Sequence, residues 1–220
     1  MTPAPRPRLP RLLLVTDRRR TRGRDLVEVV GRAAHGGVGW VQLREPDLPD
    51  DALRELVARL RAVVPEGTLL SVNTSLRVAR TAGTGLHRPA RVAIERRPDL
   101  AAAPYGRSVH DDVELGDALA EQVDYVIAGT VFPTESKPGQ RPAGVAFVER
   151  VCRLAYPVPV YAIGGISVTR VPLVVHAGAH GVAVCGALLS ANDPERVAQA
   201  MTLALEVSVR ASAGPRPTPR

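Results

Sequence analysis

The chain contains a single lysine, Lys137, although it carries 29 basic residues. Arginine therefore stands at almost every basic position, and the exception lies in the stretch FPTESKPG. An ammonium group is a compact point charge on a flexible stem, whereas a guanidinium group is a wide planar fork, so a tight anion site can require lysine. The alternative is that Lys137 survives by chance on a solvated loop.

Glycines in two short stretches could bind a phosphate group. AIGGIS contains Gly164 and Gly165, and VCGALL contains Cys185 and Gly186. Where side chains are missing, an anion can approach backbone N–H groups at the start of a helix. The alternative is that these glycines only relieve strain in turns. Cys185 is expected to be a small buried residue of this loop rather than a nucleophile.

Arg44 and His110 are the candidates for handling charge and protons. Arg44 lies in the stretch QLRE and could clamp a carboxylate or diphosphate through two hydrogen bonds. It could equally pair with Glu45. Histidine can both donate and accept a proton near neutral pH, so His110 in GRSVHD is the candidate general acid and base. Its alternative role is a structural hydrogen bond at a strand end, and His87 is a weaker candidate to line the same pocket.

Eight short apolar runs recur along the chain. Nearly continuous apolarity over four to six residues is typical of strands that are covered on both faces. The runs lie at residues 11–16, 38–43, 68–72, 84–87, 105–109, 124–129, 159–164 and 180–185. Segments with helical spacing separate most of them, the weakest lying after the third and fourth runs. Eight strand–helix units in about 200 residues predict an α/β fold, a single-domain (βα)8 TIM barrel.

In such a barrel the active site forms at the carboxyl ends of the strands. Polar residues and glycines of the sequence converge there: Thr16, Asp17, Gln42, Arg44, Glu45, Asn73, His87, Ser108, His110, Thr134 to Lys137, Gly164, Gly165, Cys185 and Gly186. His35, His176 and His180 fall at helix ends or strand starts and are expected to be structural.

The composition argues against nucleic acid and membranes as partners. The net charge is +7, but six arginines and no acidic residue lie in the Pro/Arg-rich ends, residues 1–11 and 210–220. Aromatic residues make up only 3% of the chain, which argues against stacking on nucleic acid. No apolar run reaches the length of a membrane span, so we expect a cytoplasmic protein without a membrane partner. Two cysteines, Cys152 and Cys185, indicate neither a zinc site nor a disulfide framework.

We therefore expect a barrel over residues 11–208 between disordered tails at 1–10 and 209–220. A homo-oligomer fits this sequence as well as a monomer does.

Six stretches at barrel spacing carry a family resemblance: LLLVTD, GVGWVQLRE, GRSVHDDVEL, DYVIAGTVFPTESKPG, VYAIGGIS and AGAHGVAVCGAL. Together they resemble the thiamine phosphate synthase/TenI family over about residues 11–206. The resemblance implies a thiazole phosphate ligand, with its phosphate at Gly164, Gly165, Cys185 and Gly186. In the synthases, a pyrimidine methyl diphosphate would be held by residues matching Gln42, Arg44, Asn73, Ser108, Thr134, Ser136 and Lys137.

The sequence departs from the synthase pattern at the magnesium ligands. The family's NDR reads Asn73, Thr74, Ser75, its GVHLGQED reads GLHRPARV, and the lysine of its QLREK is Pro46. Both metal-binding aspartates are therefore missing, and Asp17, Asp47, Asp111 and Asp112 occupy no matching position. Magnesium usually binds one or two carboxylates together with substrate phosphates.

Three hypotheses follow. The favoured one is a TenI-type thiazole tautomerase, which shifts a proton on a carboxythiazole phosphate with His110 as catalytic residue and needs no cofactor. The second is a thiamine phosphate synthase that uses Mg²⁺ and releases diphosphate. The third is a non-catalytic binder of thiazole or thiamine phosphate.

Overall fold

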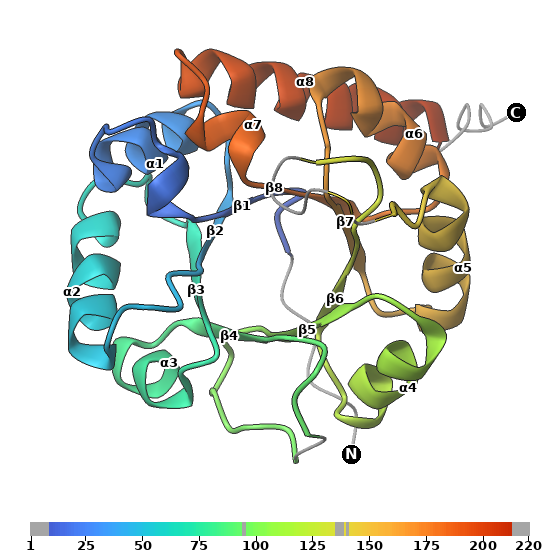
Figure 1. The fold of residues 1–220 in the computed structure, drawn as a ribbon, viewed down its shortest axis with the longest axis horizontal. Helices are drawn as coiled ribbons and strands as arrows, with labels where there is room; N and C mark the ends of the chain where they lie inside the picture. The colour runs from blue at the N-terminus through green and yellow to red at the C-terminus, as the bar shows by residue number, and fades with distance from the viewer. Residues whose placement is uncertain (1–8, 94–95, 135–138, 140, 213–220) are drawn as a thin grey trace, which may run out of the picture.

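Eight parallel strands close into a barrel in the computed structural model, which describes residues 9–93, 96–134, 139 and 141–212. The strands follow one another around the ring in chain order, as Figure 1 shows in a view along the barrel. They are β1 Leu12–Val15, β2 Trp40–Leu43, β3 Leu69–Asn73, β4 Gly85–Arg88, β5 Tyr105–Val109, β6 Tyr125–Gly129, β7 Val160–Ile163 and β8 Gly181–Val184. The predicted TIM barrel is confirmed.

Helices form an outer ring because their apolar faces pack on the strands. They are α1 Leu26–His35, α2 Asp50–Arg61, α3 Leu76–Ala82, α4 Asp112–Ala120, α5 Val145–Ala155, α6 Val171–His176, α7 Gly186–Leu189 and α8 Pro194–Ser212. Two 3-10 turns, η1 Arg18–Arg20 and η2 Val168–Arg170, precede α1 and α6. The Asp25 carboxylate caps α1 by accepting from the amides of Val27 and Glu28.

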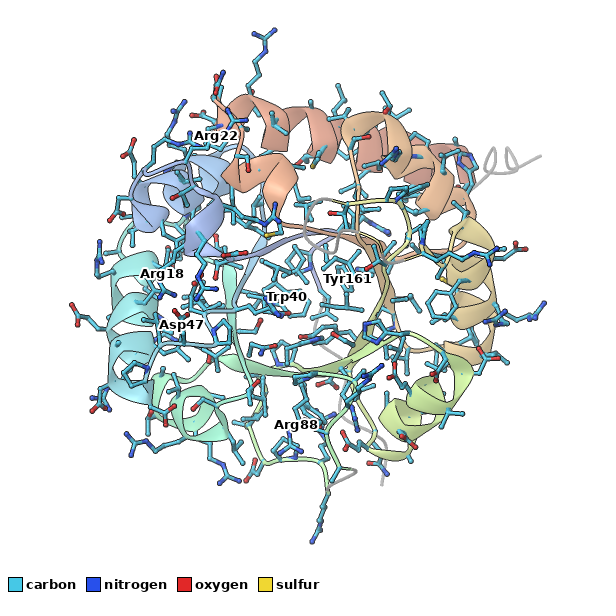
Figure 2. All side chains as sticks on the ribbon, viewed as in Figure 1. Arg18, Arg22, Trp40, Asp47, Arg88 and Tyr161 are labelled. Atoms are coloured by element: carbon cyan, nitrogen blue, oxygen red, sulfur yellow. The ribbon has the colours of Figure 1, made fainter. Side chains whose placement is uncertain are left out.

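Large aromatic side chains fill the inside of the barrel. The Trp40 ring lies edge-on to Tyr125, with 4.6 Å between ring centroids, and to Tyr161, with 5.6 Å. Figure 2 shows Trp40 and Tyr161 pointing into the ring of strands. A Cβ atom at Gly106 would lie 2.3 Å from the Tyr125 ring, so glycine on β5 makes room for the phenol of β6. The interior is therefore a packed core and not a pore.

The fourth unit departs from the predicted strand–helix repeat. Between β4 and β5 no helix forms in residues 89–93 and 96–104, the part of this connection that the structure describes. The buried Arg107 guanidinium instead donates to the carbonyls of Ala90 and Val92 at 2.7 and 2.9 Å. It also pairs with the buried Glu121 carboxylate at 2.8 Å. Arg107 of β5 thus fixes the connection between β4 and β5, which in the other units contains a helix.

The barrel boundaries are wider than the sequence predicts. Leu9, assigned to the tail, is buried, and the Pro10 carbonyl accepts a hydrogen bond from Tyr161. At the other end α8 runs to Ser212, four residues past the predicted limit. The remaining tail residues, 1–8 and 213–220, lie outside the described residues. Nowhere in the described chain is a helix long and apolar enough to cross a bilayer.

Candidate active site

The predicted site residues gather at the carboxyl ends of the strands. Gln42, Asn73, His87 and Ser108 lie within the last two residues of β2, β3, β4 and β5. The parallel register places Gln42 opposite Ser71 and Asn73 opposite His87. Because all strands run the same way, these side chains share one rim with the loops that follow β6, β7 and β8.

Gln42 carries an unpaired polar atom in this rim. The residue is 2% exposed, and its Oε1 atom has no hydrogen-bond partner among the described residues. A buried acceptor without a partner costs about 1–3 kcal/mol. A ligand N–H or O–H group would remove that cost, which supports the predicted binding role of Gln42.

Arg44 does not pair with Glu45, the alternative that the sequence left open. The buried Glu45 carboxylate instead accepts from Arg18, at 2.9 Å from its guanidinium and 3.1 Å from its backbone amide. Arg18 also bonds Asp47, and Figure 2 shows the two residues next to each other at the left of the view, beside α2. These hydrogen bonds lower the pKa of Asp47. The exposed Arg44 guanidinium has no partner among the described side chains and is available for an anionic ligand.

His87 and Ser108 form the polar centre of the rim. The His87 Nε2 atom lies 2.8 Å from Ser108 Oγ, and Nδ1 lies 3.0 Å from the Tyr125 hydroxyl. His87 is 1% exposed, and this burial lowers its pKa to about 3, with the charges of Arg44 and Arg107 acting in the same direction. The imidazole is therefore neutral at pH 7 and is a hydrogen-bonding group rather than a proton carrier.

His110, the predicted acid and base, lies directly after β5 with its side chain 37% exposed. Its Nδ1 atom is 2.8 Å from a carboxylate oxygen of Glu114, one turn along α4, and the same oxygen accepts from the His110 backbone amide. The carboxylate orients the imidazole. Within the described residues, no hydrogen bond joins the His110 side chain to His87 or Ser108.

The glycine turn after β7 packs against the loop after β6. Gly164 and Gly165 have φ of +102° and +63°, which glycine adopts without strain. A Cβ at Gly164 would come within 2.4 Å of Thr130, and one at Gly165 within 2.5 Å of the Pro133 carbonyl. The Gly165 carbonyl accepts from Arg170 at 2.7 Å. The turn is thus fixed by close packing, which also holds its position at the rim.

Cys185 and Gly186 form the start of the short helix α7. The first amides of this helix have no intrahelical acceptor, as at any helix start, and they follow β8 directly in the chain. Burial, followed by the charge of Asp17, raises the pKa of the Cys185 thiol to about 12. The thiol is therefore protonated at pH 7, in agreement with the expected small structural residue.

Sequence reasoning missed the arginines next to this loop. An open depression of about 450 Å³ is lined by Asp17, Arg19, Arg20, Arg22 and Ser190. It lies over β1 and α7, not over His87 and Ser108. The run TDRRRTRGRD, which follows the first strand, is the sequence signal that could have indicated this basic rim.

Residues at the family's metal positions serve the fold. Asn73 donates to Thr74 at 2.8 Å, Ser75 caps α3, and the Val92 carbonyl accepts from Arg107. The four other candidate carboxylates are also engaged: Asp17 with Arg20, Asp47 with Arg18 and Arg19, Asp111 with the Glu114 amide, and Asp112 with Arg150. Among the described residues, no three His, Cys, Asp or Glu side chains converge. These residues do not fit a magnesium site.

The remaining predicted residues divide into two groups. Thr134 is half-buried after β6, whereas Ser136 and Lys137 lie outside the described residues, so their binding roles stay predictions. The three histidines assigned to structure each bond a backbone carbonyl: His35 that of Gly31, His176 that of Pro172 and His180 that of Leu9.

Comparison with known proteins places this arrangement in a family. A thiamine monophosphate synthase family model matches residues 12–188. A thiamine-phosphate synthase of Mycobacterium sp. strain JLS is 38% identical over 213 residues, which cover 88% of this chain and 92% of the relative. The enzyme of Mycolicibacterium smegmatis is 36% identical, covering 90% and 92%.

A solved structure agrees with the sequence comparison. Thiamine phosphate pyrophosphorylase from Pyrococcus furiosus superposes with a TM-score of 0.79 at 28% identity, covering 90% of this chain and 96% of that one. The chain belongs to the thiamine monophosphate synthase/TenI family of thiamine biosynthesis enzymes.

Proposed function

We propose that this chain binds a thiazole phosphate at the rim and moves a proton on it, as a thiazole tautomerase. The observation that carries the proposal is the chemistry at the family's metal positions. Thr74 and Val92 stand where the synthases have aspartates. The Thr74 hydroxyl accepts a hydrogen bond from Asn73, and the Val92 carbonyl accepts one from Arg107. The glycine turns that would hold a phosphate are present. The site thus retains an anion anchor without the carboxylates that magnesium requires.

The proposed reaction needs three groups. Backbone amides of Gly165 and Gly186 would bind the phosphate, and the exposed Arg44 would bind the ring carboxylate as a bidentate pair. His110 would take a proton from one position of the heterocycle and return it at another, so that the atoms balance without a co-reactant. Glu114 would orient the imidazole.

NMR of the carboxythiazole phosphate tautomer tests this reaction. We expect the enzyme to convert it to the aromatic isomer faster than buffer does. His110→Asn should slow the conversion by about 10²–10⁴-fold, the usual contribution of general acid–base catalysis. His176→Asn, a histidine at the opposite end of the barrel, is the control and should leave the rate unchanged. A wild-type rate equal to that of buffer would rule out the tautomerase.

A second function, thiamine phosphate synthase, is favoured by the names of the curated relatives. Gln42, Arg44, Asn73, Ser108, Thr134, Ser136 and Lys137 would then hold a pyrimidine methyl diphosphate. This function predicts diphosphate release when both substrates are supplied with Mg²⁺, and no release across a magnesium titration would dispose of it. Binding of thiazole phosphate without either reaction would identify a non-catalytic binder.

A further inference from the structure

Five polar side chains inside the barrel follow one another in a single chain. Trp40 Nε1 donates to Ser71 Oγ at 3.0 Å, and the Ser71 hydroxyl lies beside the Tyr125 phenol. The Tyr125 oxygen lies 3.0 Å from His87 Nδ1, and His87 Nε2 lies 2.8 Å from Ser108 Oγ. The first four residues are at most 1% exposed, whereas Ser108 is half-buried at the rim.

The first member of the chain sets its direction. An indole N–H can only donate, so Ser71 Oγ accepts from Trp40. The Tyr125 oxygen lies beside the Ser71 hydroxyl, and no other acceptor for the Ser71 proton is found among the described residues. If Tyr125 donated to Ser71 instead, the Ser71 proton would be buried without an acceptor. A buried polar group without a partner reduces the stability of the fold. Ser71 therefore donates to Tyr125, and the Tyr125 proton is directed at His87 Nδ1.

The direction then passes through the imidazole. Because Nδ1 accepts, the neutral ring carries its proton on Nε2 and donates it to Ser108 Oγ. The Ser108 proton is left to point away from His87. We propose that this chain makes His87 a positioning residue, which presents the Ser108 hydroxyl as a hydrogen-bond donor to an acceptor atom of the bound ligand, an anionic oxygen or an unprotonated ring nitrogen.

This inference rests on the proposed function only for the identity of the ligand. His87 holds a fixed proton pattern at neutral pH because burial keeps the ring uncharged. A neutral ring with one defined tautomer can orient Ser108 without exchanging protons itself. His87 and His110 therefore have separate roles, one in orienting a hydroxyl and the other in the proposed proton transfer.

The tautomer of His87 can be measured directly. Long-range ¹H–¹⁵N NMR of uniformly labelled protein distinguishes a protonated from a bare ring nitrogen, and His87→Gln assigns the signals. We expect wild-type His87 to carry its proton on Nε2 between pH 6 and 8. In Tyr125→Phe the Nδ1 atom loses its donor, so the tautomer should become mixed. Tyr161→Phe is the matched control, because it removes the hydroxyl of a neighbouring tyrosine that bonds Pro10 and none of these five side chains.

A double-mutant cycle connects the tautomer to the ligand. Tyr125→Phe should weaken thiazole phosphate binding by about fivefold, the size of one net hydrogen bond. In the Ser108→Ala background it should have no further effect, because the hydroxyl that it orients is gone. Tyr161→Phe should leave binding unchanged in both backgrounds.

Two results would overturn the inference: a wild-type His87 protonated on Nδ1, or an equal loss of binding from Tyr125→Phe with and without the Ser108 hydroxyl. If wild-type protein does not bind thiazole phosphate, the proposed function fails. The tautomer of His87 still decides the direction of the chain in that case, so the two failures are distinguishable.

Discussion

Two arginines at the same rim show how neighbours decide a residue's role. Arg18 is held by Glu45 and Asp47, and its charge is balanced within the fold. Arg44 follows β2 and is exposed, with no partner among the described side chains. Two identical side chains thus take different roles: Arg18 is a structural cation, and Arg44 is a cation available to a ligand.

Arg44→Gln tests the second role. Charge-assisted hydrogen bonds contribute about 1.5–3 kcal/mol, so we expect the dissociation constant of the carboxythiazole phosphate to rise about 10- to 100-fold. Arg59→Gln removes the same charge from the outer surface of α2 and is the control for net charge. Calorimetry measures both, and equal effects of the two variants would contradict a specific clamp.

Lys137→Arg tests why one lysine persists. The variant keeps the charge but replaces a compact ammonium with a planar fork. We expect weaker binding of the anionic ligand with an unchanged circular dichroism spectrum and melting temperature. An indistinguishable dissociation constant would show that this lysine is an accident of sequence.

His87 should make stability depend on pH. Its pKa in the folded protein is about 3, below the ordinary histidine value of 6.5, so only the unfolded chain binds this proton between those values. The free energy of unfolding should therefore fall as pH decreases from about 6.5 toward 3, by up to about 1.4 kcal/mol per pH unit from this group.

Denaturant titrations at pH 7, 6 and 5 measure this effect. His180, whose pKa burial also lowers, adds to the wild-type slope. His87→Gln should reduce that slope while His180 continues to contribute. An unchanged slope in His87→Gln would mean that the imidazole is not kept neutral by the fold.

At the scale of elements, the connection between β4 and β5 depends on Arg107. Its guanidinium donates to two backbone carbonyls and pairs with Glu121 in a fully buried setting. Arg107→Met should reduce the free energy of unfolding by about 3–5 kcal/mol, because a buried carboxylate is left without its partner. Hydrogen exchange should rise in the described residues between β4 and β5.

The Arg107→Met/Glu121→Gln double variant is the control. It removes the unpaired charge and keeps an acceptor for Tyr105, so it should recover part of the loss. A loss below 1 kcal/mol in the single variant would show that other contacts hold this segment.

The elements themselves were predictable because burial on two faces leaves a simple sequence signal. All eight strands coincide with the apolar runs, and Gly36, Gly37 and Gly178 follow helix ends as capping requires. The sequence predicts a weak helix after the fourth run, but it does not show what replaces that helix, because the replacement is one buried arginine whose partners lie 14 to 17 positions away. The same limit applies to the Tyr125–His87 contact, which joins residues 38 positions apart.

At the scale of the whole molecule, closure of the ring brings the candidate site together. The sequence identified Gln42, Arg44, His87 and Ser108 because parallel strands place their carboxyl ends on one rim. Their hydrogen-bond partners could not be predicted from the sequence, because a position at the rim does not determine which neighbouring group a side chain bonds. The described rim also includes the arginines that follow β1, which line an open depression with Asp17 and Ser190.

A crystal structure of this chain with bound thiazole phosphate tests the central claim most directly. We expect the phosphate to lie within hydrogen-bonding distance of the Gly165 and Gly186 amides and the thiazole ring to lie toward Ser108. A phosphate bound only among Arg19, Arg20 and Arg22, or at the opposite end of the barrel near Arg11 and His180, would contradict it.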